Sequence, residues 1–173
     1  MEKAKFIINT IMTKKDYKKF LYVATFKRNK VVVPIIGLIS LMGSIIVSLE
    51  NGKLNFTELI ISWAFLFGLA IAAVIFKVEK KNAQRIKTDK TGAFDSVNTL
   101  KFYDDKIVFE NKALKSTGEL KYDQFYALME SKDYFIFYLT INQASLIRKK
   151  DIDDLGEFRD FIVEKFEGKY RRI

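Results

Sequence analysis

The chain has 173 residues, a formal net charge of +9, and neither cysteine nor histidine. Without these two residue types it has no disulfide, no thiol nucleophile, no imidazole for acid–base catalysis and none of the usual zinc or haem ligands. Few catalytic options remain. Composition therefore favours a binding, anchoring or structural role over that of an enzyme.

Residues 1–30 are predicted to form a strand followed by a helix. The segment Lys5–Met12 is rich in isoleucine and phenylalanine, which is typical of a strand, and Thr13 with Asp16 three residues later is typical of a helix N-cap. The helix carries an apolar stripe at helical spacing opposite several lysines. The stripe consists of Tyr17, Phe20, Leu21 and Ala24. Two interpretations stay open: this basic amphipathic helix lies on a membrane surface, or it packs against the domain that follows.

Two long apolar runs without a charged residue follow, at residues 31–49 and 59–76. A helix rises about 1.5 Å per residue and the hydrocarbon core of a bilayer is about 30 Å thick, so runs of this length predict two membrane-spanning helices. The link Glu50–Glu58 contains two asparagines and a glycine, which favour a tight turn. The sequence therefore predicts an antiparallel transmembrane hairpin over residues 31–78.

The basic residues indicate how this hairpin is oriented. They are concentrated before the first apolar run and after the second, and the link contains only Lys53. By the positive-inside rule both termini are cytoplasmic, in a two-span protein of the cytoplasmic membrane. The candidate contacts for anionic lipid headgroups are Lys27, Arg28, Lys30, Lys77, Lys80, Lys81 and Arg85. Residues 77–173 hold 20 basic and 17 acidic residues, so this part of the chain is close to neutral. Most of the positive charge therefore lies in the segments beside the membrane, and we expect no nucleic-acid partner.

Small side chains in the two apolar runs predict how the helices pack. They recur on one face of each run, and a small-xxx-small ridge allows two helix backbones to approach closely in lipid. The candidate packing residues are Gly37, Ser40, Ser44, Ala64, Gly68 and Ala72. Packing within the hairpin is the first interpretation and dimerisation the second. Trp63 is predicted to lie at the membrane–water interface, and the absence of ionisable residues from both runs disfavours a transporter or pump.

After the hairpin, residues 79–91 predict a charged helical stalk and residues 92–173 a small cytoplasmic domain. Short alternating runs in this domain are typical of half-buried antiparallel strands. These runs are Asn98–Tyr103, Lys106–Glu110, Thr117–Tyr122, Asp133–Thr140 and Ala144–Arg148. Asp153 or Asp154 then caps a helix that begins at Leu155 and ends near Glu167. The predicted fold class is an α+β membrane protein, in which a two-helix transmembrane hairpin precedes a small antiparallel β domain closed by a C-terminal helix.

Three segments of the domain carry a resemblance to a known family. They are YDD at Tyr103–Asp105, GELKYDQFYALMESKDYFIFYL at Gly118–Leu139, and the apolar strand that ends in Arg148-Lys149-Lys150. They resemble the C-terminal domain of the YcxB-like proteins, and the two-span hairpin before them is similar too. This resemblance implies a small bacterial membrane protein whose cytoplasmic portion is a pleckstrin-homology-like (PH-like) domain. It implies no activity and no catalytic residue.

The remaining polar clusters are interpreted as structural. Asp104 and Asp105 fit a turn, and Asp151, Asp153 and Asp154 fit helix-cap positions, with no glycine-bearing calcium loop or partner base beside them. We therefore expect no catalytic, cofactor or metal site. The predicted function is a non-catalytic, membrane-anchored binding or scaffold module at the inner leaflet, with the lipid bilayer, its anionic headgroups and a protein as partners.

The alternative function is an immunity protein. Such a protein protects the producing cell from a membrane-active toxin or bacteriocin by binding the toxin or its receptor within the bilayer. Small two-span proteins with an accessory cytoplasmic domain suit that task, although this interpretation rests on analogy. The sequence favours no particular partner.

Overall fold

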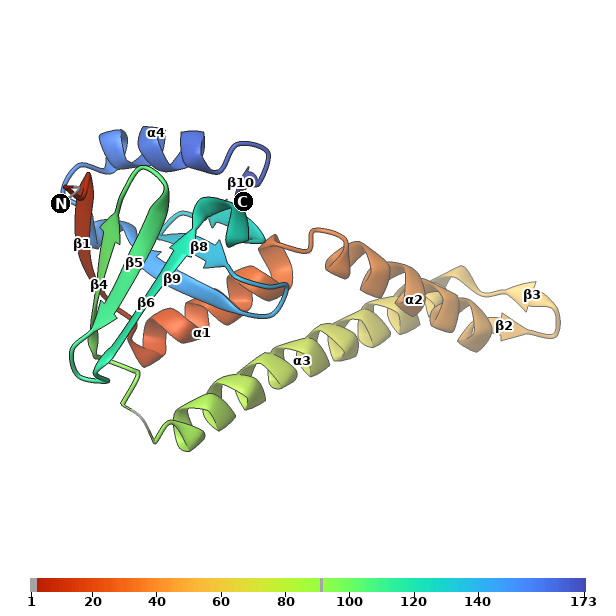
Figure 1. The fold of residues 1–173 in the computed structure, drawn as a ribbon. Helices are drawn as coiled ribbons and strands as arrows, with labels where there is room; N and C mark the ends of the chain where they lie inside the picture. Colours follow the sequence, from red (N-terminus) through yellow and green to blue (C-terminus); the bar gives the residue numbers. More distant parts are fainter. Residues whose placement is uncertain (1–2, 91) are drawn as a thin grey trace. The chain divides into compact units, whose positions relative to one another are not determined.

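A computed structural model describes residues 3–90 and 92–173. The chain forms two compact units (Figure 1). One unit, the domain, joins the described residues before Tyr17 to those from Asp89 onward. The other, the helical unit, comprises Tyr17–Thr88. The fold is α+β, as predicted.

The first sheet of the domain is antiparallel, in the order β1-β4-β5-β6. Its strands are β1 (Phe6–Ile11), β4 (Val97–Phe102), β5 (Lys106–Asn111) and β6 (Ser116–Lys121). Ile8 lies opposite Leu100, and Leu100 lies opposite Phe109. Ile8 and Leu100 are buried, whereas their strand neighbours are more exposed, as expected for strands with one face on the core.

The second sheet has the order β10-β7-β8-β9. Its strands are β7 (Ala127–Glu130), β8 (Tyr134–Tyr138), β9 (Ala144–Arg148) and β10 (Tyr170–Arg172). They pair antiparallel except that β10 runs parallel to β7. Two short 3₁₀ helices, η2 (Tyr122–Gln124) and η3 (Lys149–Asp151), follow β6 and β9.

The C-terminal helix α4 (Leu155–Lys165) closes the core of the domain. Asp154 caps it as predicted, because its Oδ1 accepts a hydrogen bond from the Glu157 backbone N–H at 2.9 Å. The fully buried Phe158 ring makes edge-to-face contacts with Phe102 of the first sheet and Phe135 of the second, at centroid distances of 5.0 and 5.4 Å. One aromatic side chain of α4 thus joins both sheets.

The N-terminal strand belongs to the domain. β1 pairs along its whole length with β4, and the backbone N–H of Asp95 donates to the carbonyl of Met12 at 3.1 Å. Since β1 and β4 are adjacent antiparallel strands, the end of β1 lies beside the start of β4. The chain therefore leaves the domain and returns to it at the same end of this strand pair. The helical unit is therefore an insertion between two neighbouring strands.

The helical unit is a hairpin of long helices. Its elements are α1 (Lys14–Tyr22), whose first turn belongs to the domain, the π-helix η1 (Val23–Lys27), α2 (Val32–Val47), β2 (Leu49–Glu50), β3 (Lys53–Leu54) and α3 (Phe56–Thr88). Asn51 and Gly52 connect β2 to β3 with φ of 50° and 76°, the positive values that a type I′ turn requires. By length and composition α3 is able to cross a membrane, and a second span results if α1–η1 and α2, which meet at a 60° bend, count as one.

Candidate functional site

The two long helices meet along small and polar side chains of α2. Ser44 and Ser48 are completely buried, and the Ser48 hydroxyl lies 3.3 Å from the Ser62 hydroxyl of α3. A Cβ atom added at Gly43 would lie 3.2 Å from Leu66 of α3, so the helices approach closely at this glycine. The same face of α2 carries the predicted packing residues Gly37, Ser40 and Ser44.

On α3 the predicted ridge of small residues does not face α2. Ala64, Gly68 and Ala72 are exposed, and a Cβ atom added at Gly68 would meet nothing within 4 Å. Large residues of α3, such as Leu66 and Phe67, meet the small residues of α2 instead. Small side chains on one of the two helices are sufficient for close packing. The four-residue spacing of small residues on α3 therefore did not predict which face of α3 contacts α2.

Trp63 contacts residues of both long helices and is 39% exposed, and its position at a membrane interface stays a prediction. Its indole N–H donates to the backbone carbonyl of Gly37 at 3.1 Å, and its ring stacks on Phe67 at a centroid distance of 5.9 Å. The indole N–H is thus bonded to the neighbouring helix α2.

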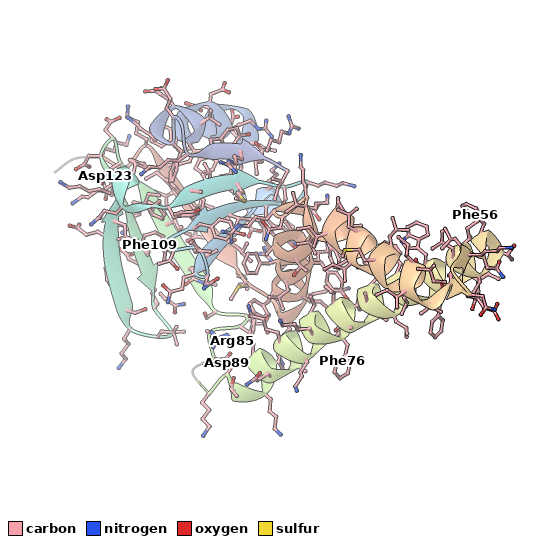
Figure 2. The ribbon with its side chains drawn as sticks, turned by 90° about the vertical axis from the view of Figure 1, so that its right-hand side faces the viewer. Phe56, Phe76, Arg85, Asp89, Phe109 and Asp123 are labelled. Carbon is pink, nitrogen blue, oxygen red and sulfur yellow. The ribbon has the colours of Figure 1, made fainter. Side chains whose placement is uncertain are left out.

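The outer surface of the hairpin is apolar. Phe56 and Phe76, at the two ends of the apolar part of α3, are each 70% exposed, and their side chains point away from the helix axis (Figure 2). In the most apolar 18-residue stretch of α3, no residue is buried by the rest of the described structure. α2 shows the same pattern, with Met42 68% and Ile46 76% exposed. The hairpin therefore has apolar groups outside and serines inside, the reverse of a water-soluble helical pair.

Seven basic residues at the open end of the hairpin are the predicted headgroup contacts. Because the helices are antiparallel, residues before α2 and residues after Phe76 lie at the same end. Arg28 and Arg85 each engage another residue. The other five are exposed and have no ion-pair or hydrogen-bond partner in the described part of the chain: Lys27, Lys30, Lys77, Lys80 and Lys81. This group is called the lysine band below.

The amphipathic helix α1 contacts the polar end of α3. Lys18 forms an ion pair with Glu79 at 2.8 Å, and the Tyr22 hydroxyl donates to the same carboxylate at 2.6 Å. These bonds hold the pKa of Glu79 below its usual value. Within the helical unit, α1 therefore lies along the segment that was predicted as a charged stalk, and this segment is part of one continuous helix that ends at Thr88.

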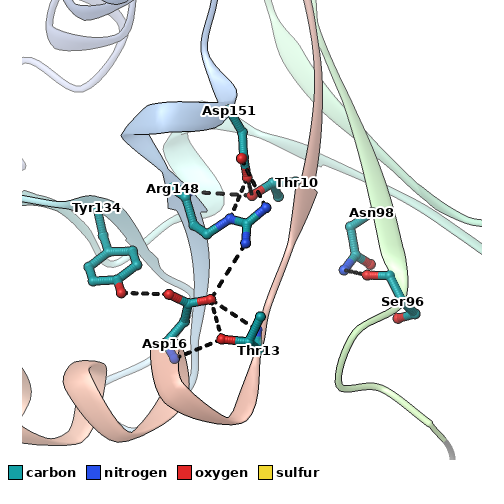
Figure 3. A network of polar contacts seen from close by, with 8 residues as sticks. All are labelled: Thr10, Thr13, Asp16, Ser96, Asn98, Tyr134, Arg148 and Asp151. Carbon is teal, nitrogen blue, oxygen red and sulfur yellow. Dashed lines mark hydrogen bonds and ion pairs between the residues drawn. The ribbon is translucent and has the colours of Figure 1, made fainter.

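In the domain, a network of polar contacts fastens the N-terminal segment to β9 (Figure 3). The Arg148 guanidinium donates to the Asp151 carboxylate at 2.6 and 2.9 Å and lies 3.7 Å from Asp16. Asp151 also accepts from the Thr10 hydroxyl at 2.6 Å, and Asp16 accepts from the Tyr134 hydroxyl at 2.7 Å. We call these five residues the clamp. It links residues more than 130 positions apart in the chain.

The predicted capping pair is also part of this region. Thr13 Oγ1 accepts from the Asp16 backbone N–H at 3.1 Å, and the Asp16 carboxylate accepts from the Thr13 backbone N–H at 3.0 Å. Burial raises the pKa of Asp16, but the hydrogen bonds from Thr13 and Tyr134 and the Arg148 charge outweigh burial and lower it overall. Asp16 therefore stays ionised next to Arg148.

A second polar cluster surrounds Glu130, whose side chain is completely buried at the end of β7. Its carboxylate accepts from Lys149 at 2.5 Å, from the Arg159 guanidinium at 2.9 Å and from the Tyr170 hydroxyl at 2.5 Å. Burial raises the pKa of Glu130, but these bonds and the Lys149 charge outweigh it and lower the pKa to about 2. The same cluster raises the pKa of Tyr170 to about 12, through burial and the bond to Glu130.

Both clusters consist of charged and polar side chains that bind one another. Every charged group in them is paired, and no group of three or more acidic residues in the described ranges 3–90 and 92–173 could hold a metal ion. Asp104 forms surface ion pairs with Lys5 and Lys165. Sequence reasoning missed Glu130 and Arg148 as network centres. Each of these two residues is a charged residue at the end of a mostly apolar strand, and this pattern in the sequence would have indicated them.

The comparisons with known proteins identify one part of the chain. Residues 102–162 match the family model described as YcxB-like protein. This confirms the resemblance found in the sequence over a segment that includes Glu130, Arg148 and Arg159. No curated protein and no solved structure matches the chain.

Proposed function

We propose, from the premise that residues 102–162 place this chain in the YcxB-like family, that it is a non-catalytic, membrane-anchored binding module. In this proposal α2 and α3 both cross the cytoplasmic membrane, and the hairpin holds a PH-like domain at the inner leaflet. The lysine band contacts anionic headgroups, and the domain offers its surface to a protein partner. The paired state of the two polar clusters favours binding over catalysis.

The apolar exterior of the hairpin carries this proposal. A soluble protein rarely exposes a continuous apolar surface of more than a few hundred Å². Here two adjacent helices expose isoleucine, leucine, methionine and phenylalanine along their length. The 16 residues of α2 span about 24 Å, close to the thickness of a hydrocarbon core when the flanking apolar residues are added. Such an apolar surface is more stable in contact with the hydrocarbon core of a bilayer than in contact with water.

The closed polar interior fits the same environment. Ser44 and Ser48 donate their hydroxyl hydrogens to backbone carbonyls of α2, at 2.8 and 2.7 Å, and Ser62 donates to the carbonyl of Glu58 at 2.7 Å. Together with the Trp63 bond, these contacts leave few polar groups of the hairpin to face lipid. This is required in the membrane, where an unsatisfied polar group costs several kcal/mol.

Cysteine labelling tests the topology directly, because the natural chain contains no cysteine. Asn51→Cys is placed in the turn between β2 and β3, and Lys150→Cys on the surface of the domain. In sealed cells a maleimide that cannot cross the bilayer is expected to modify Asn51→Cys and to modify Lys150→Cys only after permeabilisation. Modification of Lys150→Cys in sealed cells would contradict the proposal.

The lysine band predicts a preference for anionic lipid. Replacing its five lysines by glutamine is expected to remove most phosphatidylglycerol that copurifies with the full chain, because each cation near the surface contributes about 1 kcal/mol. Native mass spectrometry of the detergent-solubilised protein measures this lipid. The matched control replaces five exposed lysines of the domain, Lys112, Lys115, Lys121, Lys132 and Lys150. Equal loss of lipid in both variants would show that position is unimportant and would contradict the headgroup role.

A further inference from the structure

A pocket lies at the turn end of the hairpin, opposite the lysine band. It has a volume of about 440 Å³ and lies where α2 ends and α3 begins. Asn55, Thr57 and Glu58 line its polar side, and Val47, Ile61 and Phe65 line its apolar side. We call it the tip pocket. Its volume falls within the usual range of small-molecule sites, about 300–1,000 Å³.

Glu58 is the notable group in the tip pocket. It lies in the first turn of α3, at the third residue after Asn55, where a capping box would use its carboxylate to accept from the Asn55 backbone N–H. That N–H instead donates to the carbonyl of Ser48 at 3.0 Å. The Asn55 side chain still caps the helix, since it accepts from the Glu58 backbone N–H at 3.3 Å. The helix is thus capped without the Glu58 carboxylate.

No other described residue binds this carboxylate. Glu58 is half-buried, and neither an ion pair nor a side-chain hydrogen bond engages it within residues 3–90 and 92–173. A half-buried negative charge beside apolar side chains favours a ligand that has both a cationic and an apolar part. The cationic part forms charged hydrogen bonds with the carboxylate, and the apolar part contacts the apolar side of the pocket. The chemical class that fits is a primary ammonium group attached to an amphiphile.

The apolar wall decides which amphiphile reaches the pocket. Ile61 and Phe65 are 66% and 65% exposed, and they continue the apolar exterior of the hairpin. The pocket therefore opens where that exterior meets the polar turn formed by β2 and β3. In the proposed transmembrane arrangement this level is the boundary between headgroups and hydrocarbon. A phospholipid enters such a pocket from the bilayer without crossing water.

We propose that the tip pocket binds the headgroup of phosphatidylethanolamine, with Glu58 accepting hydrogen bonds from the ammonium and Val47, Ile61 and Phe65 contacting the lipid chains. This inference rests on the proposed transmembrane hairpin. The phosphate of the same headgroup would lie near the backbone N–H groups of Phe56 and Thr57, for which helix geometry supplies no intrahelical acceptor, while the Asn55 side chain caps that of Glu58. Choline lipids have no N–H to donate, and glycerol headgroups have no cation, so both bind more weakly.

Trp63 provides the measurement, because it is the single tryptophan of the chain and lies one residue from Ser62 of the pocket lining. The full-length protein is reconstituted into phosphatidylcholine vesicles in which a fixed fraction of the lipid is brominated phosphatidylethanolamine, phosphatidylcholine or phosphatidylglycerol. Bromine on the acyl chains quenches tryptophan fluorescence at short range. The relative quenching gives the relative affinity for each headgroup.

The wild type is expected to favour phosphatidylethanolamine about tenfold, as one charged hydrogen bond allows. Glu58→Gln is expected to lose this preference. Glu50→Gln, at an exposed position of β2 that does not line the pocket, is expected to keep it. Equal quenching by all three lipids, or an unchanged preference in Glu58→Gln, would overturn the tip pocket while leaving the hairpin in the bilayer. Absence of quenching by any brominated lipid would overturn the transmembrane hairpin and the pocket together.

Discussion

Replacing Glu130 by glutamine is expected to lower the free energy of unfolding of the domain by about 3–5 kcal/mol, the usual cost of breaking a buried ion pair. Glutamine keeps the shape of the side chain but removes the charge that compensates Lys149 and Arg159. Both cations would then remain next to a buried neutral group, with the Lys149 side chain only 13% exposed. The loss therefore exceeds that of an ordinary hydrogen bond.

Pulse proteolysis of the full-length protein in detergent, at increasing urea concentration, reports the unfolding of the domain. Glu119→Gln is the matched control, because Glu119 pairs with Lys106 on the surface and its side chain is 64% exposed. The control is expected to change stability by less than about 1 kcal/mol. A urea midpoint for Glu130→Gln equal to that of Glu119→Gln would contradict the role of the buried cluster.

Glu130 also predicts how the stability of the domain depends on pH. Its pKa is lowered from 4.5 to about 2 in the folded protein. The unfolded chain therefore binds the proton more tightly, so the contribution of Glu130 is complete above about pH 4.5 and is lost as the pH falls toward 2. The urea midpoint of the wild type is expected to decrease over this interval more steeply than that of Glu130→Gln. Parallel decreases in both proteins would contradict the assignment.

Replacing Arg148 by methionine is expected to destabilise the domain by about 2–3 kcal/mol, because charged hydrogen bonds to Asp151 are lost and two carboxylates remain without their cation. The side chains of Arg148, Asp16 and Asp151 are only 12%, 15% and 11% exposed, so water compensates them poorly. Since the clamp attaches the N-terminal segment, the effect should concentrate on β1. Hydrogen exchange of the β1 amides, Phe6–Ile11, is expected to accelerate more than that of β8.

Two variants complete this test of the clamp. Lys101→Met removes a cation from a pair with Glu110, in which both side chains are 30% exposed, and it is expected to cost less than about 1 kcal/mol. Adding Asp16→Asn and Asp151→Asn to Arg148→Met removes the uncompensated charges and is expected to restore part of the stability. If Arg148→Met and Lys101→Met accelerate β1 exchange equally, the clamp does not hold the strand.

Local patterns predicted most of the secondary structure. Alternating apolar residues located β4, β5, β6, β8 and β9 to within a few residues, and Asp154 marked the start of α4. β7 was missed because all four of its residues are buried and no alternation appears, and β10 because it is short and polar. Each of these strands depends on a partner: β10 pairs with β7, which lies some forty residues earlier.

The sequence by itself determined that the hairpin is apolar, that its turn is tight and that positive charge gathers at its open end, because composition, turn preference and charge are properties of neighbouring residues. Only the tertiary structure decided which residues meet. It joined β1 to β4 and brought Arg148 between Asp16 and Asp151. It also turned Ala64, Gly68 and Ala72 outward and gave the Glu58 carboxylate no donor among the residues that the structure describes. Pairing between distant residues depends on the packing of the whole chain, which no local pattern encodes.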